Sequence, residues 1–301
     1  MTKNGLGLYY IHASVLLFGL VGLFAEWLPL PPTAIVLGRV VFAAVALGIG
    51  IYWKGASLQL LEKKHYAYFF LLGGLLALHW VALFASIQQS TVAIGLLTFS
   101  TFPVFTAFLE PLLHATKPLP RDLLYAFLTL IGVALVLPSW SWEEPSTLGV
   151  LWGIFSGASF ALLSILNRKW VAHYSPWVIA WYQDSSAALL LWPFVWGQVW
   201  GLSPREWSLL VLLGVVFTAL AHGWFIKGLQ TVSAQKASLI ASLEPVYGIL
   251  AAAVLLGEWP SWQVYAGGGL ILGVTTYATW KGEQDTIKEQ EPIEPTTKAS
   301  L

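Results

Sequence analysis

The sequence contains no cysteine, and only 10% of its residues are charged. Without cysteine the chain can form no disulfide, no thiolate metal site and no cysteine nucleophile. The small charged fraction stands beside 57% hydrophobic residues and a mean hydropathy of +0.71. Such values lie outside the range of soluble globular domains. We therefore expect the lipid bilayer to be the solvent of this chain.

Long apolar stretches dominate the sequence. A helix needs about 20 mostly apolar residues to cross about 30 Å of hydrocarbon, because its backbone must satisfy its own hydrogen bonds there. The first stretch lacks a small-residue cleavage site, so we expect it to remain as a span. The connections are short and leave no room for a soluble domain. The sequence predicts ten transmembrane helices, over 6–25, 32–52, 66–85, 91–113, 122–138, 148–170, 177–196, 207–229, 235–256 and 260–280.

The basic residues give the orientation of these spans. Of the 15 Lys and Arg residues, all but Arg39 and Arg205 fall in the termini and in alternate connections of the ten-span arrangement. Because Lys and Arg concentrate on the cytoplasmic side, we expect both termini to be cytoplasmic. Residues 281–301 combine Lys, acidic residues and Pro, a composition that cannot bury a core, and they predict a disordered cytoplasmic tail.

An internal repeat accompanies the spans. A shift of 142 residues brings Gln88 onto Gln230, and the segment Pro103-Val104-Phe105 onto Pro245-Val246-Tyr247. We expect one five-helix repeat over 1–142 and a second over 143–280. Since each repeat has an odd number of spans, the second must enter the membrane inverted. The chain is then an all-α membrane protein whose substrate site lies between the halves, near the midplane.

One segment carries a family resemblance. The stretch Ala237-Ser-Leu-Ile-Ala-Ser-Leu-Glu-Pro-Val-Tyr-Gly-Ile-Leu, followed by Leu255-Leu256-Gly257-Glu258, resembles the ninth span of EamA-type members of the drug/metabolite transporter superfamily. Gly38-Arg39 and Leu78-His79-Trp80 agree with it. The resemblance implies a ten-helix carrier in the bacterial inner membrane that exports amino acids or other small metabolites. The first repeat departs from the second in having Phe102 where the second has Glu244.

Polar residues inside the spans are the candidates for the substrate pathway. A charged side chain at mid-span costs about 3 kcal/mol or more unless it faces protein or water. Asp184 and His222 are expected at one depth, with Glu244 near the centre. The predicted pathway consists of Arg39, His79, Trp80, Pro103, Ser156, His222, Trp224, Ser238, Ser242, Glu244 and Pro245.

The sequence leaves the role of several of these residues open. Arg39 can bind helix-end carbonyls or a carboxylate, or it can attract an anionic group of a substrate. The small-residue face around Glu244 and Pro245 suits either tight helix packing or a cavity wall. Likewise, His79-Trp80 and the pair of His222 with Trp224 suit either substrate contact or ordinary packing.

Enzyme and channel motifs are absent from the sequence. It has no His-Glu-x-x-His, no Gly-x-Gly-Asp, no cluster of metal ligands and no filter loop. We therefore expect no catalytic residue, metal, cofactor or nucleic-acid partner. A carrier for a zwitterion such as an amino acid is the favoured function. Its expected partners are a small-molecule substrate and the lipid bilayer, and a monomer is compatible with this function. An uptake carrier and a non-transport membrane protein such as an intramembrane enzyme are the alternatives.

Reporter fusions test the orientation. Fusions at residues 58, 118, 173 and 285 are expected to report a cytoplasmic location, and those at 30, 142, 203 and 259 an external one, because the basic residues fall on the first set of connections. A phosphatase and a fluorescent protein at each site are the measurement. Two neighbouring sites with the same location would remove a span from the scheme.

Overall fold

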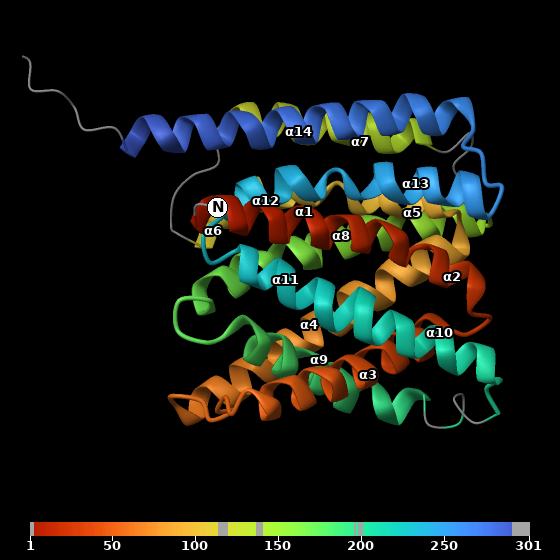
Figure 1. Ribbon diagram of the computed structural model, residues 1–301. Helices are drawn as coiled ribbons and strands as arrows, with labels where there is room; N and C mark the ends of the chain where they lie inside the picture. The colour runs from red at the N-terminus through yellow and green to blue at the C-terminus, as the bar shows by residue number, and fades with distance from the viewer. Residues whose placement is uncertain (1–2, 114–119, 137–140, 196, 198–200, 291–301) are drawn as a thin grey trace, which may run out of the picture.

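The computed structural model describes residues 3–113, 120–136, 141–195, 197 and 201–290, and these residues form helices joined by short turns. The helices run roughly along one direction (Figure 1). Their bounds are α1 Lys3–Val21, α2 Leu23–Trp27, α3 Pro32–Trp53, α4 Lys63–Gln89, α5 Val92–Phe99, α6 Phe102–Leu113, α7 Pro120–Val136, α8 Pro145–Trp170, α9 Pro176–Val195, α10 Pro204–Gly214, η1 Val215–Leu220, α11 Ala221–Gly228, α12 Ala234–Ala241, α13 Glu244–Leu255 and α14 Trp262–Gln290.

Within the described residues, 6 helical segments are long and apolar enough to cross a membrane. They are Gly5–Trp27, Pro32–Trp53, Lys63–Gln89, Val92–Leu113, Pro145–Trp170 and Pro204–Gly228. Two shorter apolar helices, Leu123–Val136 and Leu239–Leu255, coincide with the predicted fifth and ninth spans. Helices α9 and α14 occupy the positions of the predicted seventh and tenth spans. The count of ten crossings stays a prediction, and residues 137, 138 and 196 of the predicted spans lie outside the described residues.

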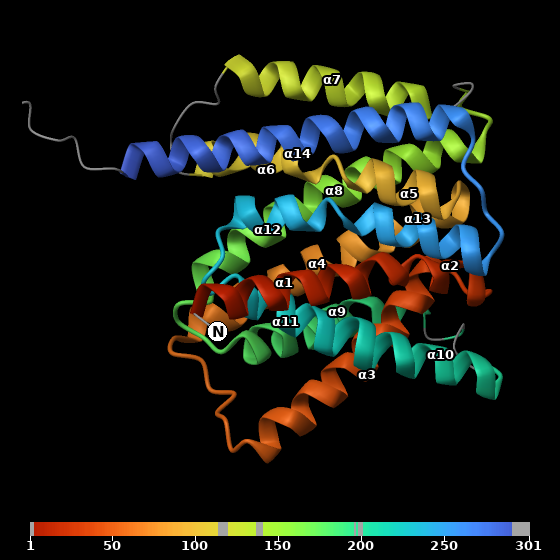
Figure 2. The same ribbon diagram turned by 45° about the horizontal axis from the view of Figure 1, so that its top comes forward.

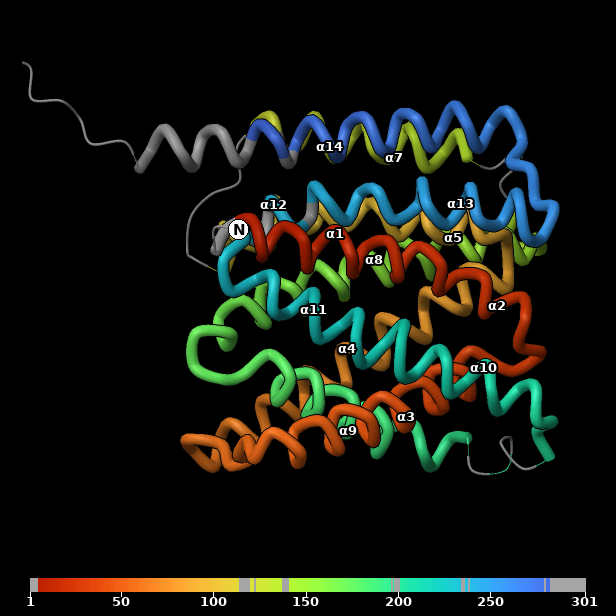
Figure 3. Tube along the Cα trace, in the orientation of Figure 1, coloured from red at the N-terminus to blue at the C-terminus, as the bar shows by residue number. Residues whose placement is uncertain are grey.

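The predicted fourth and ninth spans are not continuous helices, which corrects the sequence prediction. Each is divided into two helices, α5 and α6 in the first case and α12 and α13 in the second (Figure 3). The breaks share one cause, because Pro103 and Pro245 offer no backbone N–H and crowd the carbonyl four residues earlier. Those carbonyls belong to Phe99 and Ala241, the last residues of α5 and α12.

The two breaks also share one register. α5 begins at residue 92 and α12 at 234, while α6 begins at 102 and α13 at 244. Both differences are 142 residues, the same shift that relates the two halves of the sequence. The repeat is therefore present in the backbone, down to the residue at which each helix breaks.

A π-helix, η1, interrupts the predicted eighth span between α10 and α11. The hydroxyl of Thr218 donates a hydrogen bond of 2.8 Å to the carbonyl oxygen of Leu213, five residues earlier. A π-helical turn of this kind is a local widening of an α-helix and is frequent at functional sites. The matching segment of the first half, 73–78, is regular α-helix within α4.

Helices α7 and α14 lie side by side at one edge of the bundle (Figures 1 and 2). They approach closely through glycine, since a Cβ at Gly267 would lie 2.9 Å from the backbone nitrogen of Val136. The first turn of α1 and the last turn of α14 lie at the same end of the bundle (Figure 1).

Helix α14 is longer than the tenth predicted span. It continues to Gln290, past the start of the predicted tail at residue 281, and the disorder of that tail stays a prediction. Residues 281–290 contain Glu, Gln and Lys, which favour helix, and nothing in this segment breaks the helix that precedes it. The rest of the predicted tail, 291–301, lies outside the described residues.

The pair Gly73 and Gly74 tests the packing of α4 against α9. A Cβ at Gly73 would overlap Ser186 Cβ and lie 2.7 Å from the carbonyl oxygen of Gln183, whereas a Cβ at Gly74 would meet only the end of the Leu190 side chain, at 3.2 Å. We expect Gly73→Ala to destabilise the protein by about 1–3 kcal/mol, the usual cost of overpacking.

Gly74→Ala is the matched control, and we expect it to be neutral or stabilising because alanine favours helix by about 1 kcal/mol over glycine. Thermal unfolding of the purified variants is the measurement. Equal unfolding temperatures for the two variants would show that α4 and α9 are not packed as closely as described.

A charged cavity between the two halves

A small cavity lies where helices of both halves meet. Its volume is about 30 Å³, which has room for about two water molecules and for no metabolite. The lining comes from α1, α3, α4 and α5 of the first half and from α8, α11 and α13 of the second. It consists of Phe18, Val21, Arg39, Leu76, His79, Trp80, Leu83, Phe99, Phe160, Leu163, Ser164, Asn167, His222, Phe225 and Glu244.

Arg39 provides the positive charge of the cavity. It is 1% exposed on α3, and its guanidinium carbon lies 3.8 Å from the centre of the Trp80 ring. Its Nε donates a hydrogen bond of 2.9 Å to Thr218 Oγ1. Within the described residues, Nη1 has no hydrogen-bond partner. Among those residues, the guanidinium thus contacts an aromatic face and a hydroxyl.

The π-helix is what brings Thr218 to Arg39. Because the Thr218 hydroxyl donates to the carbonyl of Leu213, its lone pairs are free to accept the Nε proton of Arg39. Gly214 allows the two backbones to meet, since a Cβ there would lie 2.7 Å from the carbonyl oxygen of Arg39. The irregular turn and the buried arginine therefore form one unit.

Two buried carboxylates supply the negative charge. Asp184 on α9 and Glu244 at the first residue of α13 both interact electrostatically with Arg39. Asp184 is fully buried, and its Oδ1 lies 3.9 Å from Nδ1 of His222. Neither oxygen of Asp184 has a hydrogen-bond partner among the described residues. Arg39 and Glu244 thus line the cavity, and Asp184 is buried close behind it.

His79 is fixed by Ser156 across the two halves. The Ser156 hydroxyl donates to the carbonyl oxygen of His79 at 3.0 Å, and Nδ1 of His79 lies 2.9 Å from Ser156 Oγ and 3.1 Å from the Ser156 carbonyl oxygen. The His79 ring packs 5.4 Å from the Phe99 ring and 5.1 Å from the Phe160 ring. His79 therefore both joins α4 to α8 and faces the cavity.

An aromatic and an amide surface complete the lining. Trp80 lies edge to face with His222 at 5.6 Å, between Arg39 and that histidine. On another wall, Asn167 accepts a hydrogen bond from Gln183. Charged, amide and aromatic groups thus meet around one closed space.

Known proteins can now be compared with this arrangement. The sequence pattern of the EamA-like transporter family matches twice, over residues 5–137 and 147–279. The chain belongs to the EamA-like transporter family. The two matches begin 142 residues apart, at 5 and 147, which agrees with the repeat in the sequence and in the helix breaks. The resemblance found in the sequence is thereby confirmed, and this EamA-like transporter is an integral membrane protein with two related halves.

Curated relatives are named as transporters. The uncharacterized transporter YxxF of Bacillus subtilis (strain 168) is 25% identical over 254 residues, covering 82% of this chain and 81% of its own. YwfM of the same organism is 23% identical and covers 95% and 98% of the two chains. An uncharacterized transporter of Archaeoglobus fulgidus is 32% identical over 190 residues, 62% of this chain and 67% of its own.

A solved crystal structure shares the fold. It superimposes with a TM-score of 0.66 and covers 94% of this chain and 98% of its own, at 16% sequence identity. Such a likeness at so low an identity shows the fold of the EamA-like transporter and carries nothing about its substrate.

Five of the predicted pathway residues line the cavity, namely Arg39, His79, Trp80, His222 and Glu244. Ser156 reaches it through His79. Pro103, Ser242 and Pro245 are buried at the helix breaks but are not part of the lining. The Ser238 side chain lies outside the described residues.

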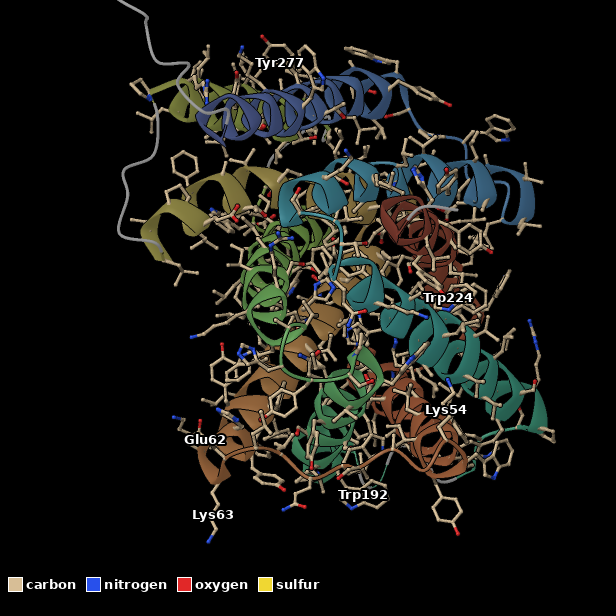
Figure 4. The ribbon with its side chains drawn as sticks, turned by 60° about the vertical axis from the view of Figure 1, so that its left-hand side comes forward. Lys54, Glu62, Lys63, Trp192, Trp224 and Tyr277 are labelled. Atoms are coloured by element: carbon tan, nitrogen blue, oxygen red, sulfur yellow. The ribbon has the colours of Figure 1, made fainter. Side chains whose placement is uncertain are left out.

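Trp224 does not line the cavity, although His222, two residues earlier, does. Its ring packs 6.1 Å from the Tyr10 ring, and it is half-buried on α11 (Figure 4). Of the two readings offered for Trp224, packing agrees with this position. Thr218, Asp184 and Asn167 are the site residues that the predicted pathway omitted, and the only sequence signal for them was the depth shared by Asp184 and His222.

The contact between Arg39 and Thr218 can be tested by paired substitutions. Thr218→Val keeps the shape of the side chain but removes the oxygen that accepts from Arg39, so we expect a loss of about 1–3 kcal/mol. Arg39→Lys keeps the charge but has no Nε donor in that place. Once lysine is present, Thr218→Val should therefore cost clearly less than in the parent. Thermal unfolding of the four proteins measures this coupling.

Thr129→Val is the matched control. Thr129 is a buried threonine of α7 whose hydroxyl has no hydrogen-bond partner among the described residues, so its loss should be neutral or stabilising. Equal losses from Thr218→Val with arginine and with lysine at position 39 would contradict the contact.

Proposed function

We propose that this EamA-like transporter is a ten-helix carrier that exports a zwitterionic metabolite, an amino acid with an apolar side chain, by alternating access. The observation that carries the proposal is that Arg39 from the first half and Glu244 from the second line one buried cavity. A guanidinium suits the α-carboxylate and a carboxylate suits the α-ammonium.

The apolar part of the cavity supports a substrate with an apolar side chain. Phe18, Phe99, Phe160 and Phe225 line the same space as the charged residues. Aromatic walls with a few well-placed polar groups are the usual composition of small-molecule sites. In the substrate-bound state, the charges would hold the backbone of the amino acid while the phenylalanines contact its side chain.

The small volume of the cavity supports alternating access. A space of about 30 Å³ admits no amino acid, so the walls must separate before a substrate can enter. Both halves contribute to the lining. Each half also contains one broken helix, α5–α6 in the first and α12–α13 in the second. Inverted repeats that rock about such helices are the common design of secondary transporters. In this scheme the second half is inverted and both termini are cytoplasmic.

Export rather than uptake is proposed because the resemblance of span nine is to exporters. The uptake carrier stays the second candidate. An intramembrane enzyme is disfavoured, since the described residues contain no group of three His, Cys, Asp or Glu that could hold a metal ion, and the relatives are named as transporters.

Counterflow in proteoliposomes tests the proposal. We expect saturable exchange of a labelled amino acid such as leucine or phenylalanine. Neither the matching 2-hydroxy acid, which lacks the ammonium, nor the matching amine, which lacks the carboxylate, should compete. Equal competition by either analogue, or no exchange of any zwitterion, would contradict the proposed substrate class.

Glu244→Gln tests the residue that would bind the ammonium. Glutamine keeps the shape and most hydrogen bonding but carries no charge, so we expect exchange to fall at least about tenfold with normal membrane insertion. Glu143→Gln, at an exposed turn before α8, is the control and should exchange like the parent. Exchange at the parental rate by Glu244→Gln would remove Glu244 from the pathway.

A further inference from the structure

A second hollow, which shares no residue with the charged cavity, opens on the side of the bundle. Its volume is about 340 Å³, and it lies between α3, the start of α9 and the π-helix η1. It is lined by Ala46, Leu47, Gly50, Ile51, Lys54, Ala56, Ser175, Trp177, Val215, Val216, Ala219 and Leu220. We call this hollow the lateral groove.

In the predicted arrangement of spans, the lateral groove extends from one membrane surface to mid-depth. Lys54 directly follows α3 and is labelled in Figure 4. Ser175 directly precedes α9, and Trp177 lies in its first turn. Val215 and Val216 lie midway between Pro204 and Gly228. Along α3, the distance from Lys54 to Ala46 is about 12 Å. One leaflet of a bilayer with about 30 Å of hydrocarbon has a similar depth.

The walls of the groove are apolar and partly unfilled. Small residues, Ala46, Gly50 and Ala219, form much of the floor. A Cβ placed at Gly50 would have nothing within 4 Å, so the floor of the groove is open there. A flexible aliphatic chain fits a narrow apolar groove of this kind better than a rigid polar molecule does.

The mouth of the groove carries one positive charge. Lys54 is exposed, and its Nζ lies 5.7 Å from the centre of the Trp177 ring. No acidic residue is among the lining residues. The charge at the mouth therefore favours an anionic headgroup, and a Trp at the headgroup level suits the same interface.

We propose that the lateral groove binds one acyl chain of an anionic phospholipid, with its headgroup at Lys54. Apolar contact alone gives little selectivity, because every lipid tail is as apolar as the groove. Headgroup preference comes instead from Lys54, and a single lysine near the surface corresponds to roughly a fivefold preference for an anionic lipid. The proposal does not depend on which substrate is transported.

A second basic hollow provides an internal comparison. It lies between α4 and α8 and is lined by Lys64, His65, Ala67, Tyr68, Leu71, Lys169 and Trp170. Lys64 is already paired with Glu62 at 2.6 Å. Lys169 is therefore the residue whose replacement distinguishes lipid binding at this hollow from binding at the lateral groove.

The test measures lipids retained by the full-length protein. The purified protein is mixed with equal amounts of phosphatidylglycerol and phosphatidylcholine of identical chains, and bound lipids are counted by native mass spectrometry. We expect the parent to retain roughly five times more phosphatidylglycerol. Lys54→Gln should bring the ratio close to one, and Gly50→Phe, which fills the groove, should reduce binding of both lipids at least severalfold.

Two controls match these variants. Lys169→Gln removes a lysine at the other hollow, and Gly269→Phe adds the same side chain on an exposed face of α14 where a Cβ would also have nothing within 4 Å. Both should retain lipids like the parent. Unfolding temperatures show that each variant is folded, and Ala46→Leu replaces Gly50→Phe as the filling variant if that protein does not fold.

Three outcomes would overturn the proposal. A folded Lys54→Gln variant with an unchanged lipid ratio would exclude the headgroup site. Unchanged lipid binding by the filling variant would exclude the acyl-chain site. A loss of preference in Lys169→Gln instead of Lys54→Gln would assign the anionic lipid to the other hollow.

Discussion

The buried guanidinium of Arg39 is the constraint on which the rest of the site depends. A charge at this depth costs about 3 kcal/mol or more unless protein groups replace its water. The bundle replaces that water with the face of Trp80, the hydroxyl of Thr218 and the charges of Asp184 and Glu244. Since the groups around Arg39 come from α4 in the first half and from α9, η1 and α13 in the second, stabilising one cation draws both halves to the same point.

The two halves share a backbone design but not a charge. Both contain a helix that is broken before a proline at the same place in the repeat. The helix after the break begins with Glu244 in the second half and with Phe102 in the first. A carboxylate at the start of a helix also interacts favourably with the helix dipole. The acidic residue of the cavity, Glu244, thus comes from the second half and the cation, Arg39, from the first, and under the proposed function this difference would orient a bound zwitterion.

The sequence indicated cavity residues where a charged residue lies within an apolar run. Arg39 and Glu244 are charges in apolar runs, and both line the cavity. The π-helix was not predictable, because a threonine within an apolar run is ordinary and its bond to Leu213 matters only once Arg39 from α3 is beside it. Asp184 and His222 lie on different helices, so their approach is a tertiary contact. Trp224 lies two residues from His222, and residues two apart in a helix do not share a face, which agrees with packing, one of the two interpretations left open by the sequence. The helix breaks coincide with Pro103 and Pro245, but the sequence predicted continuous spans there, because a proline within an apolar run can also merely kink a helix.

The central claim is that the cavity between the halves opens in turn to each side of the membrane. Ser164 lines the cavity, is 5% exposed, and has no hydrogen-bond partner among the described residues, so cysteine replaces it with little change. Because the chain has no other cysteine, Ser164→Cys is the sole target of a membrane-impermeant thiol reagent. The account predicts labelling in both right-side-out and inside-out vesicles, at rates that change when a transported amino acid is added. Labelling from one side only, with no response to any amino acid, would contradict it.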